Sequence, residues 1–335
     1  MMKPTIYDVA KEVNVSITTV SKVINNTGRI SEKTKNKVLE VMQALDYQPS
    51  TLAVALTGKR TFTIGVLVPD IANPFFAEVA RALENNAKES GYLLILCSTD
   101  YQQEREQDYL KILLKKQVDG IILATEPKDL KNFKKLQSQN IPLITFSFNH
   151  LALDSHVVTT DDVRGGYLAG RYLLDKGHHD IAVITEPQQL SGQLRLEGFK
   201  QALVDEGIHF DNGRVVNTKS VIGEAKKAAH QILDLEYKPT AVFATTDLIA
   251  AVFINEARKA NLSVPQEISI IGFDNTIHAE IVDPGLTTIA QPIPDLAHYA
   301  IHQLMQSIEN PGMSAHRILL APTLVERESV RDLRT

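Results

Sequence analysis

Three polar residues near the N-terminus, Thr18, Thr19 and Lys22, have the spacing of side chains that share one side of a helix. Their hydroxyl and ammonium groups can form hydrogen bonds with base edges in the major groove of DNA. The same segment carries an apolar stripe made of Ile17, Val20 and Ile24. Because that stripe would face a core, the three polar residues would lie off the buried face, where a groove could receive them.

The flanking segments carry the signals of two further helices that could hold this one. Thr5 can cap a first helix with Asp8 as its partner, and Asn14 tolerates the left-handed conformation that ends it. Ser16 can then cap the second helix, and Ser31 a third. The apolar residues of the first and third helices that would close the core are Ile6, Val9, Ala10, Val13, Val38, Leu39, Met42 and Leu45. Two short helices joined by a tight turn and supported by a third predict a helix-turn-helix.

Charge is distributed unevenly along the chain. Residues 1–60 contain nine Lys and Arg against five Asp and Glu, a net charge of +4, and the whole chain is −5, so residues 61–335 sum to −9. A basic N-terminal module on an acidic body is typical of a phosphate-binding domain attached to something else. The alternative is an ordinary small helical bundle, but the charge and the terminal position favour DNA binding.

Bulk composition indicates a soluble chain with more than one domain. At 335 residues, with 44% hydrophobic and 22% charged residues, two or three domains are expected. No signal peptide pattern precedes the first helix and no apolar run reaches membrane-spanning length, so we expect a cytoplasmic protein with no membrane partner. The single cysteine, Cys97, ends an apolar run and is expected to be a buried strand residue, not a nucleophile.

Residues 49–60 form a separate short segment after the third helix. Pro49 ends that helix, Ser50 can cap a new one, and Gly58 can end it after about two turns. One interpretation is a plain linker. The other is a hinge that folds only on DNA and inserts Leu56 into the minor groove. The pattern favours neither interpretation.

The body alternates apolar strand-length runs with amphipathic helices. The predicted strands are residues 62–68, 92–97, 120–124, 141–146, 180–185, 240–245, 268–273 and 286–291. The predicted helices are residues 75–90, 103–117, 129–139, 162–176, 194–206, 222–235, 248–260 and 292–309. Fully apolar strands alternating with helices predict parallel sheets covered on both faces, which makes the body α/β with two lobes in tandem.

Polar and aromatic residues follow several of these strands. In open parallel sheets, ligands bind beyond the carboxyl ends of the strands, so these residues could converge on one cavity. The candidates are Asp70, Asn73, Phe75, Phe76, Ser147, Asn149, Ser191, Arg195, Thr246, Asp247, Asp274 and Gln291. Each one alone is more simply read as a turn or cap residue. Together, carboxylates, amides, one Arg and aromatic rings are suited to a sugar, whose hydroxyls donate and accept hydrogen bonds.

No pattern in the sequence predicts catalysis. The motifs GxSxG, GxxxxGK[ST] and HExxH are absent, and the histidines lack partners at metal-ligand spacing. His178 and His179 lie at a helix-to-strand turn, where we expect capping and packing. We therefore expect no enzyme activity, no catalytic residues, no metal and no cofactor.

Long motifs resemble one known family. The run TIYDVAKEVNVSITTVSKVINN and the following GRISEKTKNKVLEVMQALDYQPSTLAVALTGKRT resemble the headpiece and hinge of the lactose-repressor (LacI/GalR) family of bacterial transcription regulators. The stretches TIGVLVPDIANPFFAEVARALE, QVDGIILA, RLEGFKQAL, PQEISIIGFDN and LTTIAQP match the same family in order. The resemblance therefore covers essentially the full length.

This resemblance implies a domain layout. Residues 1–48 would be the helix-turn-helix headpiece, 49–60 a hinge helix, and 61–335 a body similar to periplasmic sugar-binding proteins, with a ligand between two lobes. Lobe 1 would span approximately residues 61–160 and 291–320, and lobe 2 residues 161–290 and 321–335. The implied fold class is α/β, with a helix-turn-helix headpiece, a hinge helix and two parallel α/β sheets.

The resemblance also implies roles for individual residues. Ile17, Thr18 and Lys22 would read bases, and Ala53 and Leu56 would enter the minor groove. We expect the DNA-contacting residues to be Thr5, Ser16, Ile17, Thr18, Thr19, Ser21, Lys22, Asn25, Arg29, Ala53 and Leu56. Asn73, Phe75, Arg195, Asp247 and Asp274 fall on family effector positions. Lys22, Ser147 and Thr246 depart from the family, in which Arg, Asp and Asn respectively are frequent.

The expected function is a homodimeric repressor on a near-palindromic operator, with affinity controlled by a sugar in the cleft. Ligand and DNA affinities would be reciprocally linked. Alternatives are a corepressor-dependent regulator that responds to a nucleobase, nucleoside or phosphorylated metabolite, a non-regulatory sugar-binding module, and an enzyme.

Overall fold

The computed structural model describes residues 4–24, 27–47, 60–127, 133, 136, 139–148 and 155–334. They belong to two compact units, Met1–Thr61 and Phe62–Thr335. None of the helices within these residues is long and apolar enough to cross a membrane.

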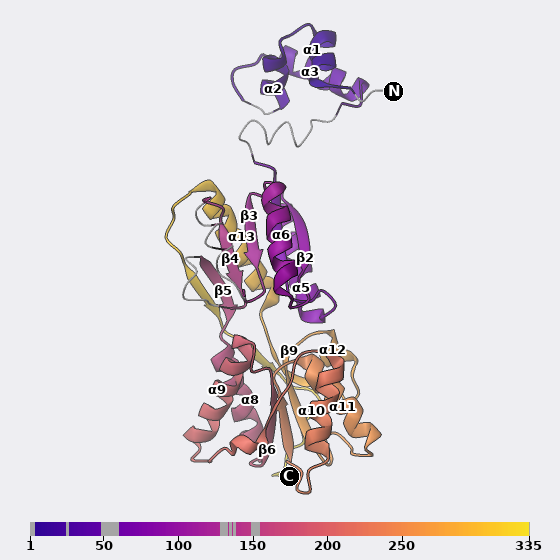
Figure 1. The fold of residues 1–335 in the computed structure, drawn as a ribbon, viewed down its shortest axis with the longest axis vertical. Helices are drawn as coiled ribbons and strands as arrows, with labels where there is room; N and C mark the ends of the chain where they lie inside the picture. Colours follow the sequence, from indigo (N-terminus) through magenta and orange to yellow (C-terminus); the bar gives the residue numbers. More distant parts are fainter. Residues whose placement is uncertain are drawn as a thin grey trace. The chain divides into compact units, whose positions relative to one another are not determined.

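The described residues of the N-terminal unit form three helices, α1 (Ile6–Val13), α2 (Ile17–Ile24) and α3 (Glu32–Ala44) (Figure 1). The predicted caps are confirmed. Thr5 forms a capping box with Asp8, and Asn14 ends α1 with φ 59° in the left-handed region. The backbone N–H of Thr19 donates to Ser16 Oγ at 3.1 Å, which starts α2. Ser31 caps α3 in the same way.

The core of this unit consists mainly of valines. The fully buried members of the cluster are Val9, Ala10, Val13, Val20, Val23 and Val38, and Ile6, Met42 and Leu45 pack partly buried against them. Leu39 is an exception, since it is 45% exposed on α3, so its predicted place in the core is wrong. Helical spacing puts Leu39 one residue past Val38, on the far side of the helix from the core. Ile17 is also exposed, at 39%, although it belongs to the predicted apolar stripe.

Lobe 1 of the body is a six-stranded sheet in the order β11-β5-β4-β3-β1-β2, and every neighbouring pair is parallel. Its strands are β1 (Thr63–Val68), β2 (Leu93–Ser98), β3 (Gly120–Leu123), β4 (Leu143–Phe146), β5 (His156–Thr160) and β11 (Arg317–Leu320). Helices α5 (Pro74–Glu89) and α13 (Ile293–Glu309) pack on one face, and α6 (Gln103–Lys115) on the other.

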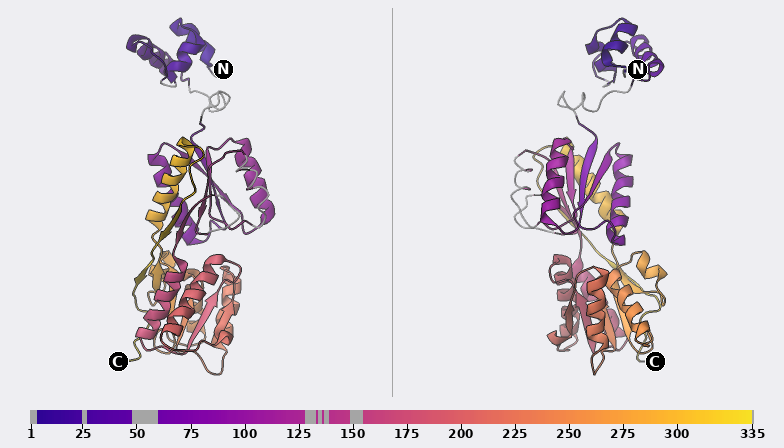
Figure 2. Two further views of the ribbon diagram at one scale, coloured as in Figure 1. Left: turned by 90° about the vertical axis from the view of Figure 1, so that its left-hand side faces the viewer. Right: turned by 45° about the vertical axis from the view of Figure 1, so that its right-hand side comes forward.

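Lobe 2 repeats this arrangement with the order β12-β10-β9-β8-β6-β7, in which only the β10–β12 pair is antiparallel. Its strands are β6 (Ile181–Thr185), β7 (Val215–Asn217), β8 (Ala241–Ala244), β9 (Ser269–Asp274), β10 (Thr287–Ala290) and β12 (Thr323–Val325). Helices α8 (Asp162–Asp175) and α9 (Leu190–Asp205) cover one face, and α10 (Ile222–Leu233) and α11 (Asp247–Lys259) the other (Figure 2). A 3₁₀ turn, η1 (Asn212–Arg214), and the short α12 (Ile277–Ile281) complete the lobe.

The chain crosses between the lobes three times, between β5 and α8, between β10 and α13, and between β11 and β12. The predicted fold class of two parallel α/β sheets is confirmed. Strands β5, β7, β11 and β12 and helix α12 were not predicted, because they are short and β5 (HVVTT) is half polar. The helix predicted at 129–139 lies mostly outside the described residues.

Candidate functional site

The exposed side of α2 carries the residues expected to read bases. Ile17, Thr18 and Lys22 are exposed, whereas Val20 and Val23 of the same helix are buried. The Lys22 stem runs beside Gly28, since a Cβ added at Gly28 would lie 3.3 Å from Lys22 Cδ. Gly28 has φ +76°, a backbone conformation that residues other than glycine rarely adopt. Glycine at this position therefore allows the turn to follow α2 closely.

The other predicted DNA contacts occupy different environments. Thr5, Ser16 and Arg29 are exposed, and Thr19 and Ser21 are half-buried. Three of these side chains also take part in helix caps. Thr5 forms a hydrogen bond with Asp8, and Ser16 forms hydrogen bonds with Thr19. Asn25, Ala53 and Leu56 lie outside the described residues, as does the predicted hinge helix. DNA contact by all eleven residues stays a prediction.

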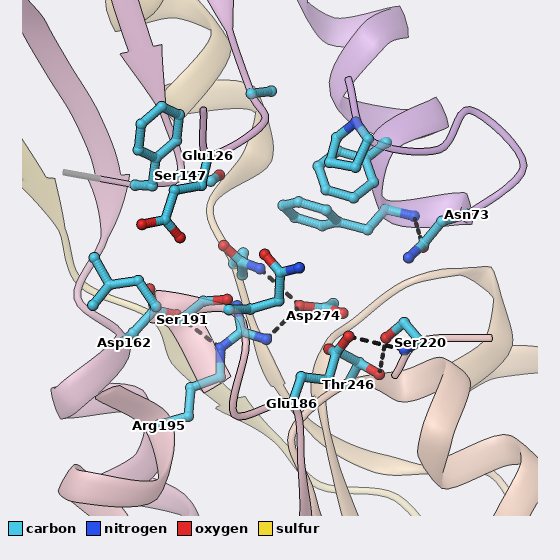
Figure 3. Close-up of a pocket in the computed structure, with 18 of the residues that line it drawn as sticks. Asn73, Glu126, Ser147, Asp162, Glu186, Ser191, Arg195, Ser220, Thr246 and Asp274 are labelled. Atoms are coloured by element: carbon cyan, nitrogen blue, oxygen red, sulfur yellow. Dashed lines mark hydrogen bonds and ion pairs between the residues drawn. The ribbon is translucent and has the colours of Figure 1, made fainter. Parts of the chain in front are cut away.

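The body contains a cavity between the lobes at the carboxyl ends of both sheets (Figure 3). About 690 Å³ of space between these residues is free of protein atoms, and this figure includes open solvent at the mouth of the cavity. Nine of the twelve candidate residues predicted from the sequence line it, namely Asn73, Phe75, Phe76, Ser147, Ser191, Arg195, Thr246, Asp274 and Gln291. Asp70 does not line this cavity, and Asn149 lies outside the described residues.

Lobe 1 contributes an aromatic wall to the cavity. Asn73 caps α5 by accepting a hydrogen bond from the backbone N–H of Phe75 at 3.1 Å, which aims the first turn of α5 at the cavity. The rings of Phe75 and Phe76 meet edge to face with centroids 5.0 Å apart. Ser147 has φ +63°, and its buried Oγ has no hydrogen-bond partner among the described residues. This wall therefore offers the apolar faces of two rings and one buried hydroxyl without a partner, that of Ser147.

Lobe 2 contributes a charged network centred on Arg195. Arg195 Nε donates to Asp162 Oδ1 at 2.8 Å, and Nη1 donates to the carbonyl oxygen of Thr245 at 2.6 Å and to Asp274 Oδ1 at 3.3 Å. The guanidinium carbon lies 3.7 Å from the centre of the Phe273 ring. All of these groups are buried, so the guanidinium is held in one orientation.

Gln291 extends this network to two of the interlobe crossings. Its Nε2 donates to Asp274 Oδ1 at 2.7 Å, and its Oε1 accepts from Thr160 Oγ1 at 2.7 Å. Thr160 ends β5 before the first crossing, and Gln291 follows β10 at the second. Hydrogen bonds therefore connect the Arg195 network to two of the three segments that cross between the lobes.

Two glycines explain how Asp162 and Arg195 come together. A Cβ on Gly166 would lie 1.8 Å from the carbonyl oxygen of Arg195, and one on Gly198 would lie 1.8 Å from that of Val163. Helices α8 and α9 therefore touch backbone to backbone, which side chains at these positions would prevent. This close packing brings Asp162 of α8 against Arg195 of α9.

Burial dominates the electrostatics of the cavity. It raises the pKa values of Asp162, Asp274 and Glu186 above their usual range, although Arg195 acts in the opposite direction on all three. Four carboxylates line the cavity, since Glu126 is the fourth, against the single guanidinium of Arg195. The formal charge of the lining is thus −4 + 1 = −3.

Asp247 is one of the predicted effector residues, and the structure places it behind the cavity wall. It does not line the cavity. It is fully buried, and its carboxylate accepts from the backbone N–H of Thr276 at 2.6 Å, from Thr276 Oγ1 at 3.2 Å and from Thr288 Oγ1 at 2.6 Å. These bonds join the start of α11 to the loop after β9 and to the first half of β10. Its neighbour Thr246 faces the cavity, and Asp247 supports the loops behind it.

Ten lining residues were not predicted: Pro69, Tyr101, Ala124, Glu126, Phe148, Asp162, Glu186, Gln189, Leu190 and Ser220. Most follow a strand closely, as Glu186 follows β6 and Glu126 follows β3. The rule used for the predicted residues could therefore have found them. Asp162 and Ser220 follow β5 and β7, two of the strands that were not predicted from the sequence.

His178 and Cys97, which were considered as a metal ligand and a nucleophile, are both buried in the packing of the body. His178 is buried and forms hydrogen bonds with Thr240 Oγ1 at 3.0 Å and the carbonyl oxygen of Arg331 at 2.9 Å, which confirms its packing role. Cys97 is buried in β2, and burial raises the pKa of its thiol to about 11. Among the described residues, no group of three or more His, Cys, Asp or Glu side chains is arranged to hold a metal ion.

Sequence comparison finds two matching family models. Residues 5–50 match the model of bacterial regulatory proteins of the lacI family, and residues 171–330 match the periplasmic binding protein-like domain. The HTH-type transcriptional regulator DegA of Bacillus subtilis (strain 168) is 44% identical over 338 residues, covering 100% of both chains.

Two solved structures extend this similarity to the fold. The Lac repressor dimer bound to operator and the anti-inducer ONPF superposes with a TM-score of 0.87 at 25% identity, covering 98% of this chain and 100% of that one. A LacI family transcriptional regulator from Enterococcus faecium with bound ribose superposes with a TM-score of 0.74 at 34% identity, covering 81% of this chain and 99% of that one. The protein that carries this α2 face and this interlobe cavity is therefore a member of the LacI family of DNA-binding bacterial transcription regulators, with a periplasmic-binding-protein-like effector domain.

Proposed function

We propose that this regulator is a repressor that binds a neutral sugar between its lobes and releases its operator when the sugar is bound. The observation that carries the proposal is the cavity itself, in which the Phe75–Phe76 wall faces the Arg195 network. Sugars combine C–H faces, which pack on aromatic rings, with hydroxyls, which donate to carboxylates and accept from amides. The ribose held by the Enterococcus faecium regulator supports the same class of ligand.

The charge of the cavity argues against a phosphorylated metabolite. The lining has a formal charge of −3, and its one guanidinium already binds Asp162 and Asp274. A phosphate would need that guanidinium, and its removal from the two buried carboxylates would leave them unpaired at a cost of several kcal/mol. A neutral ligand avoids this cost.

A nucleobase or nucleoside is the second candidate. The aromatic wall that suits a sugar face also offers edges and faces to a planar base. A nucleobase presents few hydroxyl groups to the carboxylates of lobe 2, however, so we favour the sugar. Binding measurements on both classes separate these candidates.

The mechanism follows from the three interlobe crossings. A ligand that touches both walls favours one angle between the lobes, and Gln291 and Thr160 connect its contacts to two of the crossings. We propose that a homodimer presents two copies of α2 to a near-palindromic operator, as the Lac repressor dimer is bound to its operator. The lobe angle then alters the spacing of the two headpieces, which couples effector to DNA by about 1–3 kcal/mol.

On the DNA side, we propose that Ile17, Thr18 and Lys22 read bases and that Ala53 and Leu56 enter the minor groove. The exposure of the first three residues on α2 supports the first part. Lys22 would donate to guanine O6 or N7, and Ile17 and Thr18 would offer methyl contacts to thymine. We further propose that the protein has no enzymatic activity.

The test combines ligand binding with DNA release. Operator sequences are first selected from a random pool with the full-length protein, and binding is then titrated at several salt concentrations. We expect tight binding that weakens steeply with salt. Neutral sugars, polyols, nucleosides and sugar phosphates are then compared for thermal stabilisation and for operator release.

Matched variants separate the two halves of the proposal. Lys22→Ala should lose operator selectivity and keep ligand-induced stabilisation, and Phe76→Ala should keep operator selectivity and weaken ligand-induced stabilisation. Stabilisation by sugar phosphates but not by neutral sugars would overturn the effector class. Absence of selective DNA binding at low salt would overturn the proposed regulator.

A further inference from the structure

A hydrogen bond joins the two lobes at a point outside the three crossing segments. The backbone N–H of Ile277, the first residue of α12 in lobe 2, donates to Glu78 Oε1 of α5 in lobe 1 at 3.2 Å. In Figure 1, α12 lies at the end of lobe 2 that faces lobe 1. Neither Glu78 nor Ile277 lines the cavity. We refer to this contact as the interlobe bond.

On the lobe 1 side, Glu78 is fixed relative to the aromatic wall of the cavity. Phe75 and Glu78 are three residues apart on α5, so they lie about one turn apart on the same helix. The first turn of α5 is held by Asn73, which caps it through the backbone N–H of Phe75. A movement of the aromatic wall therefore moves the Glu78 carboxylate with it.

On the lobe 2 side, Ile277 ends a short loop that begins at Asp274 of the cavity. Asp274 and Asn275 have φ values of 116° and 60°, a conformation that is costly for residues other than glycine and persists only where the surroundings enforce it. Asn275 Oδ1 accepts from Arg327 Nη2 at 2.8 Å, and the backbone N–H of Thr276 donates to a buried carboxylate of α11 at 2.6 Å. The loop is therefore held on both sides, and a shift at its first residue is transmitted to its last.

The charges around Glu78 make the interlobe bond sensitive to the lobe angle. Partial burial raises the pKa of Glu78, the Ile277 N–H and Arg81 lower it, and Glu280 of α12 raises it by repulsion. Glu280 itself lies 3.9 Å from Arg327 and is mostly exposed. One group of α12 therefore attracts the Glu78 carboxylate and another repels it, so a small change of lobe angle changes the balance between them.

We propose that Glu78 is a positioning residue for the effector response, because its bond to Ile277 holds the lobes at the angle of the ligand-bound regulator. This inference rests on the proposed function and names a residue outside the cavity that tunes it. A ligand in the cavity touches the aromatic wall on one side and Asp274 on the other. By drawing these walls together it brings the Glu78 carboxylate to the Ile277 N–H, and the bond in turn strengthens ligand binding.

The test compares variants of the full-length protein in sugar-induced operator release. Glu78→Ala removes the acceptor, and Glu78→Gln keeps an acceptor oxygen without the charge. Glu89→Ala is the matched control, because Glu89 is exposed at the end of α5. With the sugar that is most effective on the wild type, we expect Glu78→Ala to need about threefold to tenfold more sugar for half-release. Glu78→Gln should respond nearly as the wild type does, and Glu89→Ala should match the wild type.

Two further readouts exclude a merely structural role. The melting temperature without ligand should be the same for the wild type and the three variants. The operator affinity of Glu78→Ala without sugar should equal or exceed that of the wild type, since effector and operator favour different lobe angles. A weaker operator affinity, an unchanged sugar response, or equal shifts in Glu78→Ala and Glu89→Ala would overturn the proposal.

A distance measurement separates this inference from the function on which it rests. Spin labels on Lys111→Cys of α6 and Lys227→Cys of α10 report the distance between the lobes, and the native Cys97 is buried. Labelled protein is diluted with unlabelled protein, so that both labels of a pair belong to one chain. Glu78→Ala should reduce the population at the interlobe distance of this structure, and an unchanged distribution would overturn the role of Glu78. If no sugar releases the wild-type protein from its operator, the sugar effector fails, and the distance measurement alone decides on the interlobe bond.

Discussion

The α2 face and the interlobe cavity place their functional side chains in opposite environments. Thr18 and Lys22 stand in solvent on a helix whose caps lie within three residues of its own start. Arg195 is buried and bound to partners 33 to 79 residues away along the chain. Removal of a reading residue should therefore change DNA recognition without affecting folding, whereas removal of a cavity residue should affect both folding and ligand binding.

This difference shows how the two functions can evolve separately. A solvent-exposed side chain on α2 can be exchanged at little cost in stability, so operator preference can change by single substitutions. A buried ion network changes only when several residues change together, because an unpaired charge is expensive. The following predictions test this contrast, from the largest expected effect to the smallest.

Arg195→Ala should produce the largest loss. It leaves Asp162 and Asp274 buried without their cation, which costs about 3–5 kcal/mol in the free energy of unfolding of the body. Urea unfolding followed by circular dichroism measures this change. Arg171→Ala is the control, since Arg171 forms exposed ion pairs with Asp175 and Glu206 and should change little. Equal effects of the two variants would remove the contrast.

The buried acids should make the body less stable as the pH rises. Burial raises the pKa of Asp247 from its usual 3.8 to about 6 in the folded protein. The folded state therefore binds the proton more tightly than the unfolded state, and its contribution is complete below about pH 4 and is lost by about pH 6. The loss is up to ~3 kcal/mol.

The comparison of wild type with Asp247→Asn isolates this contribution from those of other acids. The difference between their unfolding free energies should change across pH 4–6 and be flat above pH 7. A difference that does not depend on pH would contradict the assignment.

Lys22→Ala should alter recognition and not stability. We expect a loss of about 1–3 kcal/mol of discrimination at one base position in each operator half-site, measured by competitive binding of single-base variants. The melting temperature should stay unchanged. Lys33→Ala, an exposed substitution on α3, should keep the base preference. Unchanged selectivity in Lys22→Ala would remove it from the reading set.

Phe76→Ala should have the smallest effect. The exposure of its ring is intermediate between that of the α2 residues and that of the Arg195 network. Its ring is only partly buried and faces the cavity, so effector affinity should fall about fivefold to tenfold, or ~1 kcal/mol of packing. Calorimetric titration with the best-binding sugar measures it. Phe62→Ala, at an exposed lobe 1 ring outside the cavity, should leave affinity unchanged. A larger loss of stability than of affinity would make Phe76 a core residue.

Much of the fold could be predicted because its signals are local. The caps at Thr5, Ser16 and Ser31 depend on residues two or three positions away, and apolar runs mark strands such as β1 and β8. Strands β5 and β7 escaped prediction because short or half-polar segments lack such a run. Leu39 was placed in the core for a different reason. The spacing of apolar residues predicts the helix α3, but it does not say which side of that helix meets the core.

The cavity was predicted in outline and missed in detail. The strand-end rule found nine lining residues, because parallel strands bring their carboxyl ends to one edge. It could not distinguish Thr246, which faces the cavity, from Asp247, which turns inward to Thr276 and Thr288. Adjacent residues point in different directions, and only the packing of β9 and β10 decides between them.

By itself, the sequence determined the helix-turn-helix, the two α/β lobes and the polar character of the strand ends, since each depends on periodicity or on neighbours in the chain. Only the tertiary structure decided that Arg195 binds Asp162, Asp274 and the carbonyl oxygen of Thr245. The reason is physical. Buried charges find partners across space, through the backbone contact of α8 and α9 at Gly166 and Gly198, and no local pattern records which distant carboxylate will be within 3 Å.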